Sequence, residues 1–176
     1  MDRYADGDNA AFAEVYDGVA PRVLAWLERH TGGDHTLAQD LLQATLLRMH
    51  DARGRFIRGA RVLTWAYTIA RRLLIDTRRT RHGETHYVET MPNELVEPEA
   101  QGLVEAAETA RCMAAAFGKL PAQSREAFTL TRGEGLSLRE TAEVLGTTVM
   151  AVKLRVHRAT RALHAAMAGM AEARTR

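Results

Sequence analysis

The sequence predicts an all-α protein: two small helical domains joined by an acidic linker, the second containing a helix-turn-helix. Three observations support this. Only 6% of the 176 residues are aromatic and four are proline, while alanine and leucine are plentiful, which favours helices over a β-sandwich. Apolar residues recur at intervals of three and four, as on buried helical faces. The charge changes sign on both sides of residues 82–107, where we expect the linker.

We expect three or four helices before the linker. Their ranges are 8–29, 34–52 and 62–79, with a loop at 53–59. Gly32-Gly33 separates the first two helices, and Asp34 or Thr36 caps the second. Pro21 is a site where the first helix can kink or divide.

After the linker we expect four helices. Their approximate ranges are 99–117, 122–132, 137–145 and 148–167. Ser137 and Glu140 have the spacing of a capping box, in which each side chain bonds an otherwise unpaired backbone N–H. Gly146 ends that helix because glycine readily adopts a left-handed turn, and Thr147 or Thr148 caps the next. Residues 137–163 therefore have the pattern of a helix-turn-helix.

The second helix of this unit has an apolar back and a basic front. Its expected buried residues, spaced by three and four, are Val149, Val152, Val156, Ala159 and Leu163. The segment 151–163 holds four basic residues and no acidic one. Such a front suits the phosphate-lined major groove, which the second helix of this motif enters. A surface helix of an ordinary bundle is the alternative interpretation.

The formal net charge of +2 hides blocks of opposite sign. Residues 48–81 carry ten arginines and two aspartates, whereas residues 82–110 carry seven glutamates and no Lys or Arg. Residues 151–176 are basic again, and 22 of the 24 basic residues in the chain are arginine. Arginine presents a planar fork of donors that suits phosphate and guanine edges. We expect two polyanion-binding units on an acidic tether; solvated helix faces and arginine-rich codon usage are the alternatives.

Arginines and aromatic residues are interleaved around the loop before the third expected helix. Unpaired bases stack on rings and guanidinium planes, so the pattern suits single-stranded nucleic acid. Arg55, Arg58 and Arg61 lie in a loop too short to have its own core, which favours a functional role. For Trp65 and Tyr67 we favour a place in the core of the helix.

Three parts of the chain, in this order, are similar to a known family. They are residues 38–49 (AQDLLQATLLRM), residues 65–79 (WAYTIARRLLIDTRR), and the group 120–128, 135–146 and 152–159. They resemble region 2.2, regions 2.3 to 2.4 and region 4 of the small extracytoplasmic-function (ECF) sigma factors, in the sigma-70 family of bacterial RNA polymerase. Each part alone is moderately specific, and the three together are highly specific.

The resemblance implies a sigma factor that binds core RNA polymerase at the β′ clamp and β flap and performs no chemistry. It would recognise the −35 and −10 promoter elements as DNA and help to melt the −10 element. The implied divisions are 1–81 for polymerase and the −10 element, 82–107 for the linker, and 108–176 for the −35 element. An anti-sigma factor is the implied regulator.

The resemblance also assigns residues, in three groups. The implied polymerase contacts are Asp40, Gln43, Leu46 and Leu47. The implied −10 contacts are Arg55, Phe56, Arg58, Arg61, Thr64, Arg71, Arg72, Arg78 and Arg79. The implied −35 contacts are Ser137, Arg139, Thr148, Ala151, Lys153, Leu154, Arg155 and Arg158.

Three departures from the family pattern matter. Gln43-Ala44 stands where the family commonly has Gln-Glu, and Arg71-Arg72 stands where it has Arg-Asn. Leu154 replaces a residue that is often small and polar. Leucine cannot hydrogen-bond a base edge but can pack on a thymine methyl group. The promoter sequence is therefore the least transferable implication.

Other functional classes have little support in the sequence. We find no phosphate-binding glycine loop, nucleophile elbow or carboxylate pair, and expect neither catalysis nor a cofactor. The single cysteine, Cys112, excludes a disulfide framework; we expect a small buried residue, with a redox sensor as the weaker alternative. His82 and His86 are four apart, but they lie in the linker and we expect no metal site.

The sequence predicts a cytoplasmic protein and leaves two alternative functions open. No apolar run approaches the roughly 18 residues that span a bilayer, and the polar N-terminus is unlike a signal peptide, so we expect a cytoplasmic protein. A stand-alone helix-turn-helix regulator that binds operators as a dimer would explain residues 137–163 but leave 38–79 without a role. An adaptor that holds polymerase without reading DNA would leave the arginine-rich loop unexplained.

Overall fold

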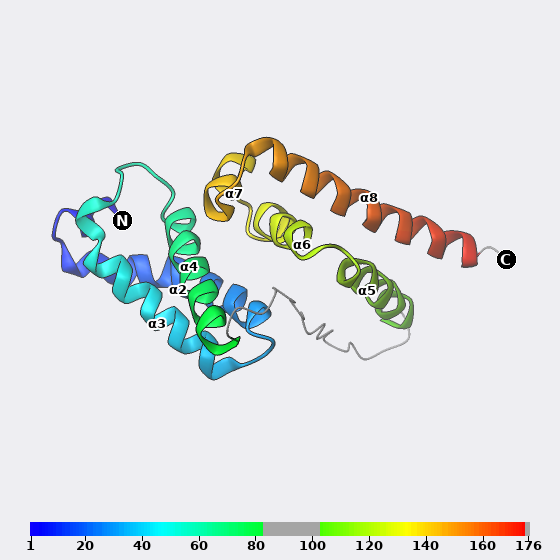
Figure 1. Ribbon diagram of the computed structural model, residues 1–176, viewed down its shortest axis with the longest axis horizontal. Helices are drawn as coiled ribbons and strands as arrows, with labels where there is room; N and C mark the ends of the chain where they lie inside the picture. The colour runs from blue at the N-terminus through cyan, green and yellow to red at the C-terminus, as the bar shows by residue number, and fades with distance from the viewer. Residues whose placement is uncertain (83–102, 175–176) are drawn as a thin grey trace. The chain divides into compact units, whose positions relative to one another are not determined.

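The computed structural model describes residues 1–82 and 103–174, with side chains described for 1–80 and 107–171. Every regular element in these ranges is helical, and the chain forms two compact units (Figure 1). The predicted all-α class with two helical units is therefore confirmed. Within the same ranges, no helix is both long and apolar enough to cross a membrane.

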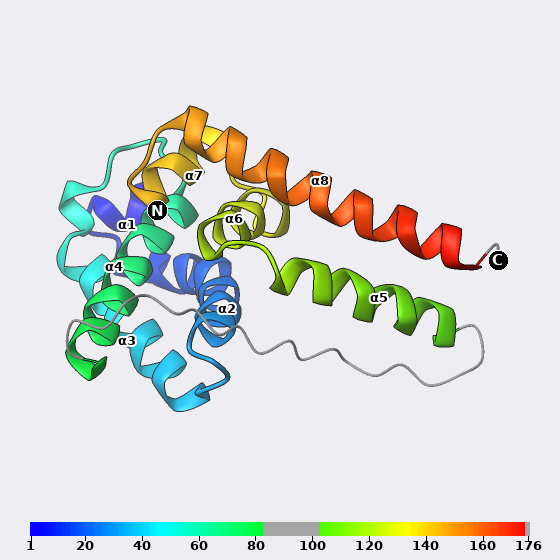
Figure 2. The ribbon, with the colours of Figure 1, turned by 45° about the vertical axis from the view of Figure 1, so that its right-hand side comes forward.

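The first unit is built on three long helices that pack against one another (Figures 1 and 2). Its elements are α1 (Asp2–Ala5), a 3-10 turn (Asn9–Ala11), α2 (Phe12–His30), α3 (His35–Asp51), a 3-10 turn (Arg53–Arg55) and α4 (Val62–His82). Asp34 is the cap of α3, since its side chain accepts a hydrogen bond of 2.9 Å from the Leu37 N–H. Pro21 lies inside α2 and does not divide it.

The core of the first unit is centred on aromatic rings from α2 and α4. Trp26 and Tyr67 are fully buried and meet edge to face, with 5.8 Å between ring centroids. Trp26 also stacks on His30 at 4.2 Å. The expected place of Tyr67 in the core is confirmed, whereas Trp65 is half-buried. The apolar residues that recur along α2 are buried at Val15, Val19, Val23, Trp26 and Leu27, whereas Phe12 is half-buried and Tyr16 is 44% exposed.

His30 connects the end of α2 to α4. The ring is 3% exposed, and its Nδ1 donates a hydrogen bond of 2.7 Å to the carbonyl oxygen of Trp26. The guanidinium of Arg78 donates to the backbone carbonyl of His30 and so binds the carboxyl end of α2. Burial lowers the pKa of His30 from 6.5 to about 3; the hydrogen bond to Trp26 opposes this shift, and nearby arginines add to it. The ring is therefore neutral at neutral pH.

The second unit is built around its last helix. Its elements are α5 (Leu103–Gly118), α6 (Ala122–Phe128), a π-helical turn (Thr129–Gly133), α7 (Leu138–Leu145) and α8 (Val149–Arg174). Both α5 and α6 pack on α8. The sequence predicted an end of α8 near Met167, but the helix continues to Arg174 because α5 supplies a packing partner along its second half (Figure 2). The predicted start of α5 near residue 99 lies outside the described residues.

Arg125 closes the turn between α5 and α6. Its side chain is only 6% exposed, and its Nη1 donates to the carbonyl oxygens of Gly118 and Leu120 at 2.8 Å each. Carbonyl groups at the end of a helix have no partner within the helix. The buried guanidinium satisfies them and fixes the direction in which α6 leaves α5.

The helix-turn-helix forms as the sequence predicts. Glu140 accepts a hydrogen bond of 2.7 Å from the Ser137 N–H, and the Ser137 hydroxyl accepts one of 3.2 Å from the Glu140 N–H. Gly146 has a φ of +61° in the turn. Thr148 caps α8, accepting a hydrogen bond of 3.1 Å from the Ala151 N–H.

The prediction that five apolar residues of α8 are buried is wrong for one of them. Val152, Val156, Ala159 and Leu163 are all buried, but Val149 is 45% exposed. Side chains of a helix tilt towards its N-terminus, so the first residue projects past the start of the helix. Its side chain therefore escapes the packing that covers the rest of the stripe.

Acid should destabilise the first unit through His30. The unfolded chain binds this proton below pH 6.5, whereas the folded chain binds it only near pH 3. The stability that the neutral ring contributes is thus complete above pH 6.5 and is lost as the pH falls towards 3. We predict that the free energy of unfolding is about 2 kcal/mol lower at pH 5 than at pH 7.

The measurement is urea unfolding followed by tryptophan fluorescence, because both tryptophans, Trp26 and Trp65, lie in the first unit. His30→Gln should lose most of this pH dependence, and His164→Gln, which changes an exposed histidine of α8, should keep it. Equal pH dependence in His30→Gln and the unchanged chain would contradict the assignment.

Candidate nucleic-acid and protein interfaces

A hollow of about 440 Å³ opens in the first unit between the N-terminal segment and α3. Its lining residues are Tyr4, Asn9, Phe12, Gln43, Leu46, Leu47 and His50. Three of the four predicted polymerase contacts thus share one surface, and the fourth, Asp40, is exposed one turn before Gln43. Leu47 is 59% exposed at the hollow. A hollow with apolar walls and an exposed leucine suits an apolar side chain of a protein partner.

The N-terminal segment forms one wall of this hollow, which the sequence analysis missed. Tyr4 is 1% exposed, its hydroxyl is hydrogen-bonded to Nδ1 of His50, and its ring lies 5.3 Å from that of Phe12. Arg3 binds Asp8 at 2.8 Å and Glu14 at 3.0 Å, which holds the segment against the start of α2. Tyr4 and His50 are 46 residues apart, so no local pattern pairs them.

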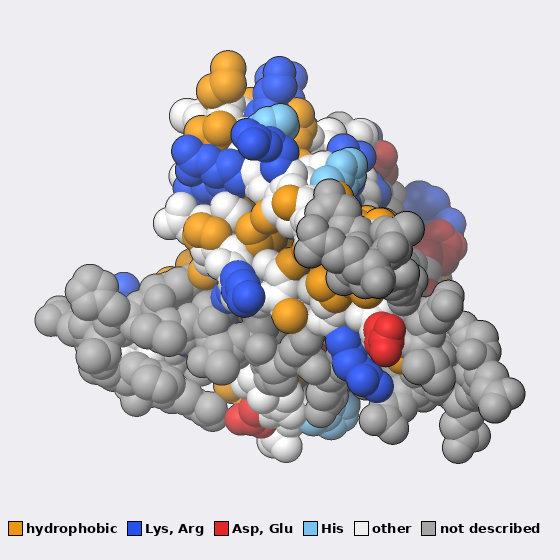
Figure 3. Space-filling model, turned by 90° about the vertical axis from the view of Figure 1, so that its right-hand side faces the viewer, with side chains coloured by type: hydrophobic (Ala, Val, Ile, Leu, Met, Phe, Trp, Pro, Cys, Tyr) orange, Lys and Arg blue, Asp and Glu red, His pale blue; other side chains and the backbone are white. Residues whose placement is uncertain are grey.

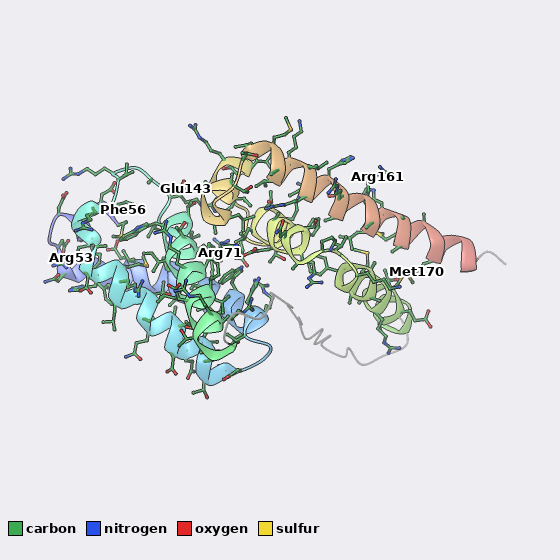
Figure 4. All side chains as sticks on the ribbon, in the orientation of Figure 1. Arg53, Phe56, Arg71, Glu143, Arg161 and Met170 are labelled. Atoms are coloured by element: carbon green, nitrogen blue, oxygen red, sulfur yellow. The ribbon has the colours of Figure 1, made fainter. Side chains whose placement is uncertain are left out.

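The loop between α3 and α4 exposes its arginines and buries its aromatic residue. The exposed arginines are Arg55, Arg58 and Arg61, for which the sequence predicts a contact with unpaired DNA. Phe56 is only 8% exposed, and its ring lies 5.3 Å from that of Trp65. Thr64, at the start of α4, is 5% exposed. Phe56 and Thr64 therefore hold the loop to the unit, and their contact with the −10 element stays a prediction. Figure 4 marks Arg53 and Phe56 in this loop.

Ile57 is a surface residue that the sequence analysis did not select. It is 77% exposed, the highest value among the large hydrophobic residues that the structure describes. Its carbonyl oxygen accepts a hydrogen bond of 3.0 Å from the Ala60 N–H, in a tight turn where Gly59 has a φ of +74°. Arg58, inside the turn, forms an ion pair with Asp6. These contacts present an apolar side chain among arginines.

The predicted arginines of α4 occupy two kinds of position. Arg72 and Arg79 are exposed, and Arg79 lies 3.5 Å from Asp76. Arg71, marked on α4 in Figure 4, and Arg78 are half-buried. Because Arg78 binds the carboxyl end of α2, it has a structural role whatever it does with DNA.

The helix-turn-helix presents most of its predicted DNA contacts to solvent. The exposed ones are Ser137, Arg139, Thr148, Lys153, Leu154 and Arg158, whereas Ala151 and Arg155 are half-buried. Arg155 Nη2 donates a hydrogen bond of 2.7 Å to Gln123 Oε1 of α6. Lys, Arg and His side chains gather with hydrophobic ones at the upper edge of Figure 3, the side on which α8 begins in Figure 1. Met150, which the sequence analysis did not select, is 72% exposed.

The described residues give little support for a metal site or a redox-sensing cysteine. No group of three or more His, Cys, Asp and Glu side chains in that part of the chain is placed to hold a metal ion. The His82 and His86 side chains lie outside the described residues. Cys112 is half-buried rather than buried, and its Sγ lies 3.8 Å from the carbonyl oxygen of Ala166.

Comparison with known proteins identifies the family. Residues 15–83 match Sigma-70 region 2, and residues 110–163 match Sigma-70, region 4. The chain is 33% identical over 161 residues to the RNA polymerase sigma factor CarQ of Myxococcus xanthus, covering 90% of each chain. It is 32% identical over 164 residues to the ECF RNA polymerase sigma factor SigF of Caulobacter vibrioides, covering 93% of this chain and 89% of SigF.

A solved structure agrees with these relatives. The structure of CnrH in complex with the cytosolic domain of CnrY has a TM-score of 0.62 and 27% identity, and it covers 94% of this chain and 92% of CnrH. Two sigma regions thus match in the order in which the two helical units follow one another. The chain therefore belongs to the ECF group of the sigma-70 family and is a sigma factor that directs transcription.

Proposed function

We propose that this sigma factor binds core RNA polymerase and the −10 element through its first unit and the −35 element through its second. The proposed divisions are residues 1–81, the linker 82–107, and residues 108–176. One observation carries the proposal: the two most basic parts of the sequence form exposed surfaces on units that match sigma regions 2 and 4. The protein acts by binding alone, and polymerase makes the RNA.

Polymerase is proposed to cover the hollow beside α3. The exposed face of this helix carries Asp40 and Gln43 next to Leu46 and Leu47, so polar contacts surround an apolar centre. Interfaces of this composition derive most of their affinity from the few residues at the centre. The β′ clamp is the proposed partner here, and the β flap is proposed to bind the second unit.

The −10 element is proposed to open because the first unit binds unpaired bases better than paired ones. Arginines of the loop meet the phosphates, and guanidinium planes accept unstacked bases. Ile57 adds an apolar side chain that can pack on a base only after the base leaves its stack. When DNA binds, Arg58 leaves its ion pair with Asp6 and forms one with a DNA phosphate instead.

The −35 element is proposed to lie as duplex against the start of α8. Lys153 and Arg158 are exposed there and neutralise phosphates, while Ser137 and Arg139 add contacts from α7 and the turn before it. Arg155 reaches DNA only if it leaves Gln123, so its proposed role includes orienting the helix on α6.

The remaining proposals concern regulation and location. An anti-sigma factor is proposed to cover the two units, in keeping with CnrH, which was solved in complex with the cytosolic domain of CnrY. The protein is proposed to act in the cytoplasm, where its polymerase and promoters are. A stand-alone helix-turn-helix regulator is not favoured, because residues 15–83 match sigma region 2.

In-vitro transcription tests the function as a whole. The full chain is added to purified core polymerase on a library of promoter fragments, and transcript starts are sequenced. We expect initiation at a subset of fragments that share two spaced elements. A folded chain, free of inhibitor, that gives no specific initiation would contradict the proposal, and a palindromic footprint without polymerase would favour the stand-alone regulator.

The polymerase surface predicts a specific loss of affinity. Gln43→Ala combined with Leu47→Ala should weaken binding to core polymerase by about tenfold or more, because both residues lie at the centre of the proposed contact. Competition against a second sigma factor measures this affinity. Asp17→Ala, an exposed change on α2 outside the hollow, is the control and should compete as the unchanged chain does. If the double variant, the control and the unchanged chain compete equally well, α3 is not part of the polymerase interface.

The contact between Arg158 and phosphate predicts a change in salt dependence. Arg158→Ala should weaken holoenzyme binding to promoter duplex and reduce the slope of log affinity against log salt by about one contact. The matched control is Arg111→Ala, an exposed arginine of α5. If both variants keep the original slope, Arg158 does not touch the DNA backbone.

A further inference from the structure

The start of α8 presents two exposed apolar side chains on one face. Met150 is 72% exposed and Leu154 is 47% exposed. Residues four apart on a helix lie one above the other, so these two side chains are neighbours. Residues two apart on a helix are separated by a rotation of about 200°. Met150 and Leu154 are each two residues from Val152, so both lie on the opposite face. Val152 is fully buried, so the pair points directly away from the core of the unit.

On this face the exposed hydrogen-bond donors His157 and Arg161 lie further along the helix, one and two turns after Leu154. Arg155 is turned towards α6 and donates to Gln123 at 2.7 Å. The donors that flank Met150 and Leu154 are Lys153 and Arg158, which are exposed and suit phosphate. At the start of α8 the face therefore has positive charge at its sides and apolar atoms at its centre.

A DNA major groove offers the complement of this arrangement. Phosphates line its edges, and the C5-methyl group of thymine is the distinct apolar group that a base pair exposes in it. Methionine is flexible and polarizable and adapts to such a group, whereas leucine is more rigid. An apolar pair framed by cations thus matches duplex DNA better than it matches an uncharged protein groove.

We propose that Met150 and Leu154 read thymine methyl groups in the −35 duplex. This inference rests on the proposed role of α8 in −35 recognition. Four residues of helix rise about 6 Å, and successive base pairs are about 3.4 Å apart. The two methyl groups therefore belong to base pairs no more than about two steps apart.

Replacement of thymine by deoxyuridine tests the proposal, because deoxyuridine pairs identically and lacks only the methyl group. Holoenzyme made from the full chain and core polymerase first selects its preferred site from a duplex library with a randomised upstream segment. The selected duplex is then synthesised with deoxyuridine at each thymine in turn. At one or two positions the substitution should weaken binding by about fourfold, the effect of exposing one buried methyl group.

Alanine variants assign each position to a side chain. Met150→Ala should abolish the response to deoxyuridine at one position and Leu154→Ala at the other. Both residues are exposed, so the fold should be kept. Met167→Ala removes a methionine of the same helix that is 48% exposed, and it should respond to deoxyuridine as the unchanged chain does.

The outcomes separate this inference from the function on which it rests. Sites that are enriched but contain no thymine, or bind equally with deoxyuridine, would overturn the inference and leave −35 recognition standing. Alanine variants that weaken thymine and deoxyuridine duplexes alike would also overturn it, since the pair would then contact something other than the methyl groups. Failure to enrich any upstream sequence would refute −35 recognition and this inference together.

Discussion

The second unit depends on the packing of one stripe of α8 against α5 and α6. Val152, Val156, Ala159 and Leu163 are all buried along this stripe. A helix has only one rotation about its axis that buries a given stripe, so the packing also decides which residues face solvent. Met150, Lys153, Leu154 and Arg158 are exposed for this reason. The surface proposed to face DNA is thus a consequence of the hydrophobic core.

The first unit applies the same constraint to a loop. A segment as short as the one between α3 and α4 has no core of its own, and Phe56 fixes it by packing on Trp65. Once Phe56 is buried, Ile57 and the neighbouring arginines are left at the surface. The salt-bridged N-terminal segment does similar work beside this loop, where Tyr4 and His50 build one side of the hollow beside α3. Both proposed contact surfaces therefore rest on buried aromatic residues.

Features that depend on neighbouring residues were predictable from the sequence. The capping box of Ser137 and Glu140, the cap at Asp34 and the turn at Gly146 all involve residues within a few positions of one another. The helical class and the helix-turn-helix followed from such local signals. Charge blocks and family resemblance placed the proposed interfaces on stretches that have exposed faces in the structure, and the contacts themselves stay predictions.

Features that depend on packing between distant residues were not predictable. Interleaved aromatic residues and arginines suggested Phe56 as a DNA contact, but only its packing on Trp65 shows that its neighbour Ile57 faces outward. Val149 fitted the apolar period of α8, yet its place at the first turn leaves it exposed. Arg78 matched the pattern of a helix that ends in basic residues. Its hydrogen bond to the carbonyl group of His30, 48 residues away, could not be predicted from any local pattern.

The central claim is that the two basic surfaces bind two separate promoter elements at once. The most direct measurement attaches a DNA-cleaving iron chelate at Lys153→Cys or at Ile57→Cys, in a Cys112→Ser background, and maps the cuts in a holoenzyme–promoter complex. The account predicts cuts around the −35 duplex from position 153 and around the unpaired −10 segment from position 57. Cuts from both positions in the same element, or from position 57 in the −35 duplex, would contradict it.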